Sequence, residues 1–182
     1  MAEITLNCGF GRAAFLAVRV FKLRRILEIG SYDGDGSTQV LISAMKPLRP
    51  KRLVCLEMRP ERFANLQTNT RRYSWVEAAC ASTISWDGFS NRDFEVDVLP
   101  HLEASLDAAA IQRRKGFWES DARIIKTSTR GYLEENAETF DAVLIDGGAY
   151  SAYDEFRLLR DRSRCFMLDD VFRGYKNKKV FE

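Results

Sequence analysis

Carboxylates that close short apolar runs are the residues of this chain most suited to chemistry. Glu28, Glu57 and Asp146 each close such a run, and Asp169 and Asp170 follow another. Apolar runs of this length are typical of the buried strands of a parallel sheet. Ligands bind at the carboxyl ends of the strands in such sheets, so we expect these acids to gather along one rim.

The first acid leads into a glycine-rich turn, residues 28–38, with the sequence EIGSYDGDGST. Three glycines there can adopt positive φ and bring the backbone close to a ligand, namely Gly30, Gly34 and Gly36. Ser37 and Thr38 are candidate caps for a helix over 37–45, whose first N–H groups would offer donors. The glycine spacing differs from the G-x-G-x-x-G of dinucleotide sites, which disfavours a nucleotide-dependent oxidoreductase.

Glu57 lies about one strand-and-helix unit after the glycine turn. A carboxylate at the end of the second strand of a βαβ unit can accept hydrogen bonds from both hydroxyls of a ribose. A solvated surface acid is the alternative interpretation of Glu57 taken alone. The pairing with the upstream turn favours the ribose role.

The elements that must position these residues follow from the apolar periodicity. Strands are predicted at 25–29, 52–57, 75–80, 123–126, 140–146 and 164–168. Helices are predicted near 10–23, 37–45, 60–71, 99–114, 129–137 and 151–161. This alternation predicts an α/β fold, a Rossmann-like, doubly wound and mostly parallel sheet with flanking helices. The rhythm breaks at about 83–121, which we interpret as an insertion within a single domain, 1–182.

Composition narrows the class of protein. With 182 residues, 46% of them hydrophobic, the chain suits one globular domain with a full core. The 28 basic and 26 acidic residues leave a formal charge of +2, so nucleic-acid binding is not expected. Cys8, Cys55, Cys80 and Cys165 occur singly and suggest reduced core residues. These isolated cysteines, together with a single histidine, His101, argue against a zinc site and a disulfide framework.

The apolar stretch at 13–21 is interrupted by Arg19 and lacks a cleavage-like end. We interpret it as an amphipathic helix that packs on the sheet rather than as a signal peptide or membrane span. No membrane partner is expected, and the absence of an export signal favours the cytoplasm. The sequence leaves the oligomeric state open, including a homo-oligomer.

Four motifs together resemble those of class I S-adenosylmethionine-dependent methyltransferases. They are EIGSYDG at 28–34, LEMRP at 56–60, FDAVLID at 140–146 and LDDV at 168–171. The likeness is to catechol O-methyltransferase-like enzymes and to bacterial methyltransferase-like proteins. It covers about residues 24–182 apart from 83–121, and it does not identify the substrate.

The resemblance implies S-adenosylmethionine as cofactor and methyl transfer to an oxygen or nitrogen of a small-molecule acceptor. Two segments compete for the adenine, 81–82 and 127–128, and the sequence does not settle which. The expected cofactor-binding residues are Glu28, Gly30, Ser31, Tyr32, Gly34, Gly36, Ser37, Glu57, Met58, Ala81, Ser82 and Asp146.

The resemblance also implies a catalytic role for Asp146 and a magnesium site, in which hard oxygen ligands would hold an ion that lowers the pKa of an acceptor hydroxyl. A side-chain ammonium of Lys176 or Lys178 is the competing cation. Catechol-type enzymes carry a lysine where this chain has Ala149. That departure motivates a second hypothesis, a non-catalytic binding domain that retains the fold. The expected metal ligands are Asp146, Asp169 and Asp170.

Aromatic residues are concentrated in the insertion. They either shape the acceptor pocket or attach the insertion to the body of the protein. A histidine in the same segment is more often structural than a base, so it is not included among the catalytic residues. These residues are Trp86, Phe89, His101, Phe117 and Trp118.

Overall fold

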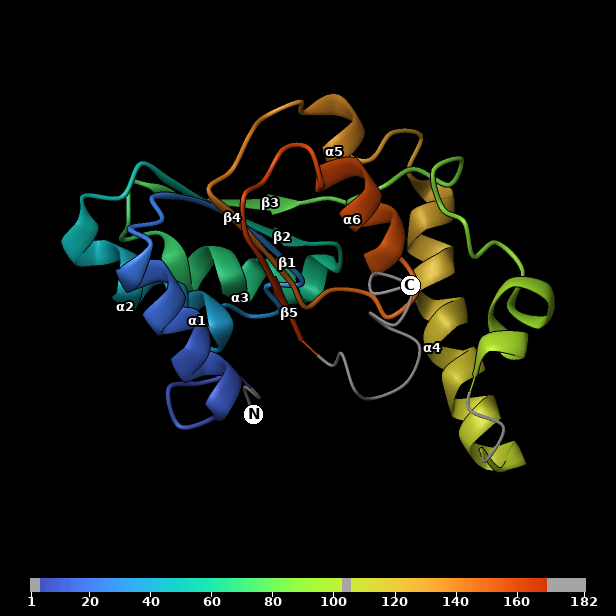
Figure 1. The fold of residues 1–182 in the computed structure, drawn as a ribbon. Coiled ribbons are helices and arrows are strands. Elements are labelled where there is room, and N and C mark those ends of the chain that lie inside the picture. Colours follow the sequence, from blue (N-terminus) through green and yellow to red (C-terminus); the bar gives the residue numbers. More distant parts are fainter. Residues whose placement is uncertain (1–3, 103–105, 170–182) are drawn as a thin grey trace.

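The computed structural model describes residues 4–102 and 106–169. A five-stranded sheet forms its centre, with strand order β3-β2-β1-β4-β5, and every pairing is parallel (Figure 1). The predicted α/β class with a parallel sheet is confirmed. The strands are β1 (Arg25–Ile29), β2 (Arg52–Glu57), β3 (Val76–Cys80), β4 (Ala142–Ile145) and β5 (Phe166–Leu168).

Helices cover both faces of the sheet, as in a doubly wound fold. One face packs against α1 (Gly9–Val20), α2 (Ser37–Met45) and α3 (Pro60–Thr70). The other packs against the short α5 (Tyr132–Glu135) and α6 (Ala152–Leu159). The N-terminal apolar stretch is therefore an amphipathic helix on the sheet, as predicted. Short turns of helix complete the order, η1 (Lys46–Leu48), η2 (Phe94–Val98) and η3 (Leu99–His101).

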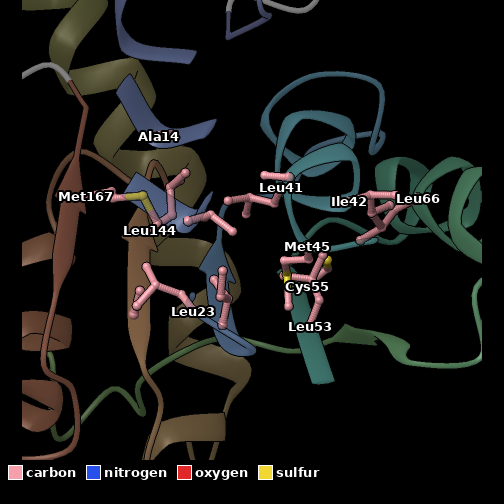
Figure 2. Close-up of a cluster of buried hydrophobic side chains, with 14 residues drawn as sticks. Ala14, Leu23, Leu41, Ile42, Met45, Leu53, Cys55, Leu66, Leu144 and Met167 are labelled. Carbon is pink, nitrogen blue, oxygen red and sulfur yellow. The ribbon is translucent and has the colours of Figure 1, made fainter. Parts of the chain in front are cut away.

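Successive strand residues alternate between the two cores, which explains why the strands are almost wholly apolar. In β2, Leu53 and Cys55 belong to the first core, whereas Val54 and Leu56 belong to the second. Figure 2 shows the first core, where side chains from α1 and α2 meet those of the central strands. A strand buried on both faces cannot carry a polar face, so its run ends abruptly at the rim.

The long helix α4 (Ala108–Thr127) corrects two predictions. The strand predicted at 123–126 is wrong, because these residues form the last turns of α4, and the helix predicted at 99–114 begins only at residue 108. Asp107 caps α4 by accepting a hydrogen bond from the Ala110 N–H at 2.6 Å. Trp118, Ala122 and Ile125 pack in one cluster at helical spacing, which overrides the β-branched Ile-Ile pair.

The prediction that all four cysteines are core residues is wrong. Cys55 is buried, but Cys80 is exposed and Cys8 and Cys165 are half-buried. Cys8 instead caps α1, because its sulfur accepts a hydrogen bond from the Gly11 N–H at 3.2 Å. In the described part of the chain, no helix has the length and apolar character needed to cross a membrane.

Candidate functional site

A cavity of about 460 Å³ lies at the carboxyl ends of the strands. Its wall is made by the segments that follow four of them, and α4 contributes a further side. The predicted rim of strand ends therefore exists as a concave site. The lining segments are 29–33 and 36–37 after β1, 56–59 after β2, 81–83 after β3, and 146–151 after β4.

Glu28 supports the glycine turn from beneath rather than lining the cavity. Its side chain is fully buried, and one carboxylate oxygen accepts hydrogen bonds from the hydroxyls of Ser31 at 2.8 Å and Thr38 at 2.6 Å. These bonds tie the turn and the start of α2 to β1. The predicted caps are wrong, because Gly36 occupies the N-cap of α2 and Thr38 instead reaches back to the strand.

Two of the three glycines take the positive φ that was predicted. Gly30 has φ +85° and Gly34 has φ +81°, whereas Gly36 has φ −97°. A Cβ on Gly30 would lie 2.5 Å from the Asp146 carbonyl oxygen, so this glycine lets β1 and β4 converge. Gly34 packs against Leu66 of α3 and is absent from the residues that line the cavity.

The backbone N–H groups of the turn are partly used within the protein. Gly30 and Ser31 both donate to the Leu56 carbonyl oxygen at 3.0 Å. Further along, Gln39 and Val40 already donate to the Gly36 carbonyl oxygen, so the donors left to face a ligand are the N–H groups of Ser37 and Thr38 at the start of α2. Gly36 and Ser37 line the cavity at that point. This helix start favours a negatively charged or electron-rich group.

Glu57 borders the cavity with only 5% of its surface exposed. One carboxylate oxygen accepts the backbone N–H of Arg59 at 2.8 Å. Burial raises the pKa of Glu57, although this N–H and the charge of Arg62 oppose the rise. Tyr32 lies beside it with φ +52°, and the guanidinium of Arg62 sits 4.4 Å from the centre of the Tyr32 ring.

The helix α4 crosses the cavity and is held at two places. Asp121 accepts a hydrogen bond from the Arg59 guanidinium at 2.7 Å, and it also lies against Gly148, where a Cβ would be 3.1 Å from its carboxylate. The Tyr150 hydroxyl donates to the Arg114 carbonyl oxygen at 2.8 Å. Asp121 thus connects the segments that follow β2 and β4, and burial raises its pKa.

Of the two segments considered for the adenine, only the one after β3 meets the cavity. Ala81 and Ser82 line it together with Thr83, whereas 127–128 lie at the end of α4 and are not among the lining residues. The Thr83 hydroxyl donates to Glu155 at 2.5 Å, and the Ser151 hydroxyl donates to the same oxygen at 2.9 Å.

Of the predicted metal ligands, Asp146 lines the cavity. Asp169 follows β5, and its backbone N–H donates to the Ile145 carbonyl oxygen at 3.4 Å. Asp170, Lys176 and Lys178 lie outside the described residues. Within residues 4–102 and 106–169, no group of three histidine, cysteine or acidic residues is arranged to hold a metal ion. The magnesium site stays a prediction.

The aromatic residues of the insertion divide into two groups. Trp86 packs on Phe89 with ring centres 5.8 Å apart, and Trp118 packs on Phe94 at 5.9 Å. These four belong to a third apolar cluster that attaches the insertion to the body. Phe117 differs, because it lines the cavity and is 63% exposed.

Sequence reasoning missed the residues that α4 and the flanking loops bring to the site. Arg59 and Arg62 follow Glu57 closely, and their spacing from it was the available signal. Arg114 and Asp121 would have been found by interpreting 108–127 as one amphipathic helix. Glu155 gave no signal, because an acid in a helix is ordinary.

The fold is shared with solved methyltransferase structures. The chain is similar to the O-methyltransferase from Bacillus cereus in complex with SAH (20% identity, 90% of this chain, 56% of that one, TM-score 0.52). It is also similar to cofactor-bound Rv0187 from MTB (20% identity, 95% and 60%, TM-score 0.55). A third is the SAH-bound methyltransferase PaMTH1 from Podospora anserina (16% identity, 89% and 52%, TM-score 0.51).

At these identities the likeness establishes the fold, and the fold implied by the four motifs is confirmed. The chain spans between 52% and 60% of the length of these three proteins. No protein-family profile matches the sequence, and neither does any curated protein.

Proposed function

We propose that the protein binds S-adenosylmethionine in this cavity and transfers its methyl group to an oxygen or nitrogen of a small molecule. The observation that carries this proposal is the position of Glu57. Its buried carboxylate borders the same cavity as the Gly30–Tyr32 turn, and Ala81 and Ser82 complete the wall after the next strand. This arrangement fits a nucleoside with two ribose hydroxyls.

Different segments of the cavity wall would bind different parts of the cofactor. The turn after β1 and the first turn of α2 would hold the amino-acid end, Glu57 the ribose, and the segment after β3 the adenine. When bound, the cofactor supplies an electrophilic methyl group on a positively charged sulfur. The chain's own task is then to hold an acceptor lone pair in line with that group and to exclude water.

Asp146 is proposed to orient the acceptor and to hold its proton, because it borders the cavity at the end of β4. The magnesium-assisted form of this role needs Asp169 and Asp170 as further ligands. Methyl transfer that survives excess EDTA would remove the metal from the proposal. A cytoplasmic location belongs to the same proposal.

Calorimetric titration with S-adenosylhomocysteine and with NAD tests the cofactor assignment. We expect the first to bind and the second not to bind. Binding of NAD alone would refute the proposal in favour of a dinucleotide enzyme.

The second candidate is a binding domain without catalysis. Ala149 favours it, because this residue lines the cavity and offers no group that could accept a proton. Cofactor binding without methyl transfer to any member of a broad panel of hydroxyl and amine acceptors would support the second candidate. Turnover of one acceptor would exclude it.

A further inference from the structure

We propose that the α4 side of the cavity binds the methyl acceptor and selects a planar molecule that carries a negative charge. The inference rests on the proposed methyl transfer, because it names the substrate class of that same site. Arg114 and Phe117 are the residues that would make the selection.

One face of α4 borders the cavity. Arg114, Phe117, Asp121 and Ile125 all line it, and their spacing of three and four residues places them on one side of the helix. Arg113 lies outside this face and is exposed. The cavity therefore meets a cation, an aromatic ring, an ion-paired acid and an aliphatic side chain in sequence.

Phe117 is the exposed apolar side chain on this face of α4. It keeps 63% of its surface exposed, whereas the neighbouring Trp118 is packed on Phe94 and donates its indole N–H to the Asn91 carbonyl oxygen at 2.8 Å. An exposed aromatic ring at the edge of a cavity gains most when a flat apolar ligand covers it.

Arg114 is the unneutralised cation of this face. Its side chain forms no ion pair or hydrogen bond with any described residue, and only its backbone is engaged, by the Tyr150 hydroxyl. Of the other two arginines in the wall, Arg59 pairs with Asp121, and Arg62 lies over Tyr32 and interacts with the charge of Glu57. Arg114 as a residue is half-buried, and a guanidinium without a counter-charge favours an anionic ligand.

Five acids line the cavity. Asp33 accepts the backbone N–H of Asp35 at 3.1 Å, and Asp146 is the residue proposed to hold the acceptor's proton. Asp121 is held by Arg59, and Glu155 accepts two hydroxyl groups. Glu57 receives the Arg59 N–H and is assigned to the cofactor. The Tyr150 hydroxyl holds the Arg114 carbonyl oxygen, and Tyr150 lines the cavity in the same segment, 146–151, as Asp146.

Three probes of one shape and different charge test the proposal. Benzoate, benzamide and benzamidine carry a negative, a neutral and a positive group on the same ring. Their binding is measured by ligand-observed NMR, with the protein alone and with the protein saturated with S-adenosylhomocysteine. We expect benzoate to bind about tenfold more tightly than benzamide, the usual gain from a hydrogen bond to a charged group.

Variants assign the effect to residues. Arg114→Gln should remove the preference for benzoate and leave the affinity for S-adenosylhomocysteine unchanged. Arg113→Gln is the matched control, because it removes the same charge from the neighbouring position outside the cavity, and it should keep the preference. Phe117→Ala should weaken benzoate and benzamide by the same factor.

Several results would overturn the proposal. They are equal affinity for the three probes, a preference for benzamidine, no binding of any probe, or a benzoate preference that survives Arg114→Gln. If S-adenosylhomocysteine binds and the charge preference is absent, this inference fails alone. If the preference is present and S-adenosylhomocysteine does not bind, the proposed methyl transfer fails and an anion site remains.

Discussion

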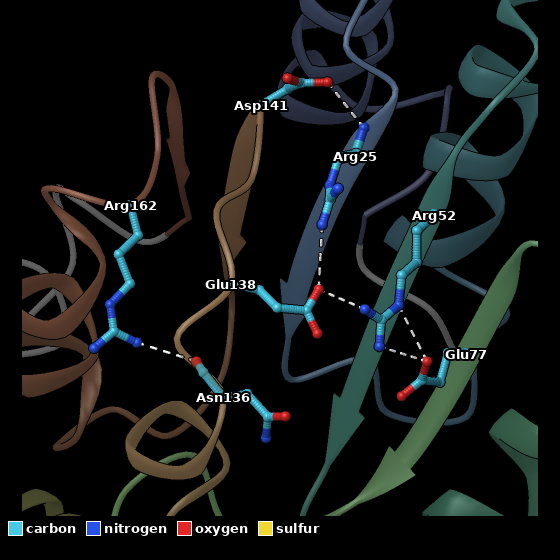
Figure 3. Close-up of polar contacts among 7 residues, drawn as sticks. All are labelled: Arg25, Arg52, Glu77, Asn136, Glu138, Asp141 and Arg162. Carbon is cyan, nitrogen blue, oxygen red and sulfur yellow. Dashed lines mark hydrogen bonds and ion pairs between the residues drawn. The ribbon is translucent and has the colours of Figure 1, made fainter.

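The two ends of the parallel sheet both carry charged side chains, and they use them differently. At the amino ends of the strands, Arg52 pairs with Glu77 at 2.6 Å and also with Glu138, which in turn accepts from Arg25 at 3.3 Å (Figure 3). Asp141 accepts the backbone N–H of Arg25 at 2.9 Å. These charges neutralise one another and remain partly in water, with Glu138 28% exposed.

At the carboxyl ends, the acids are more deeply buried and less completely paired. Glu28 is fully buried and one of its carboxylate oxygens has no hydrogen-bond partner among the described residues, while Glu57 is 5% exposed and burial raises its pKa. Burying charge in this way costs stability, and such costs are concentrated at binding sites. The two ends therefore differ in how their charges are compensated: the charges at the amino ends neutralise one another, whereas Glu57 is buried beside the cavity with its pKa raised.

The largest expected effect comes from Gly30→Val at the carboxyl end. A Cβ there would lie 2.5 Å from the Asp146 carbonyl oxygen, and φ +85° is strained for a β-branched residue. We expect a loss of about 3 kcal/mol or more in the free energy of unfolding, measured with denaturant. Gly116→Ala is the control, since nothing lies near its Cβ in α4, and it should gain about 0.5–1 kcal/mol. Parent-like stability of Gly30→Val would contradict this account of the turn.

Glu57→Gln and Glu138→Gln test the two ends directly. Glu57→Gln should weaken S-adenosylhomocysteine by about 1.5–3 kcal/mol in calorimetry, because it removes a charged acceptor of hydrogen bonds. Glu138→Gln should leave that affinity unchanged and cost at most about 1 kcal/mol of stability, because its ion pairs are partly exposed. The comparison fails if both variants affect the affinity equally.

The pH dependence of binding sharpens the same comparison. Because burial raises the pKa of Glu57, this carboxyl group takes up its proton at a higher pH than an ordinary glutamate. Affinity for S-adenosylhomocysteine should therefore fall as the pH drops through that raised pKa. Glu57 acts on folding in the opposite direction, because ionising a buried acid costs stability as the pH rises. Calorimetry across acidic pH should find the fall in the parent protein and not in Glu57→Gln.

A smaller effect is expected from the ion pair that holds α4 over the cavity. Arg59→Gln, Asp121→Asn and the double variant form a cycle, and we expect a coupling energy of about 1 kcal/mol in S-adenosylhomocysteine affinity. The pair is well shielded, with side chains 20% and 14% exposed. Lys115→Gln breaks an exposed ion pair between Lys115 of α4 and Glu95, and it should leave the affinity for S-adenosylhomocysteine unchanged. Strict additivity of the Arg59 and Asp121 effects would show that α4 is not coupled to the site.

The sequence alone determined the sheet and the edge at which the cavity lies. The bounds of β1, β2 and α2 agree with the predicted 25–29, 52–57 and 37–45, because strands buried on both faces are mostly apolar and the chain turns polar where they end. Glu57 at the end of β2 and Asp146 after β4 were placed for the same reason. The glycine turn was also predictable, because positive φ restricts the choice of residue.

Only the tertiary structure decided that α4 forms one side of the cavity and which side chains line the cavity. The sequence of residues 123–126 is compatible with a strand and with a helix. Only the packing of this segment with Trp118 and Ala122 selects the helix. Glu28 was predicted to contact the ligand, but in the structure it is buried and supports the glycine turn. The hydroxyls of Ser31 and Thr38 that bind it come close to it only after folding. Contacts of this kind join residues by their positions in space, and local sequence carries no record of them.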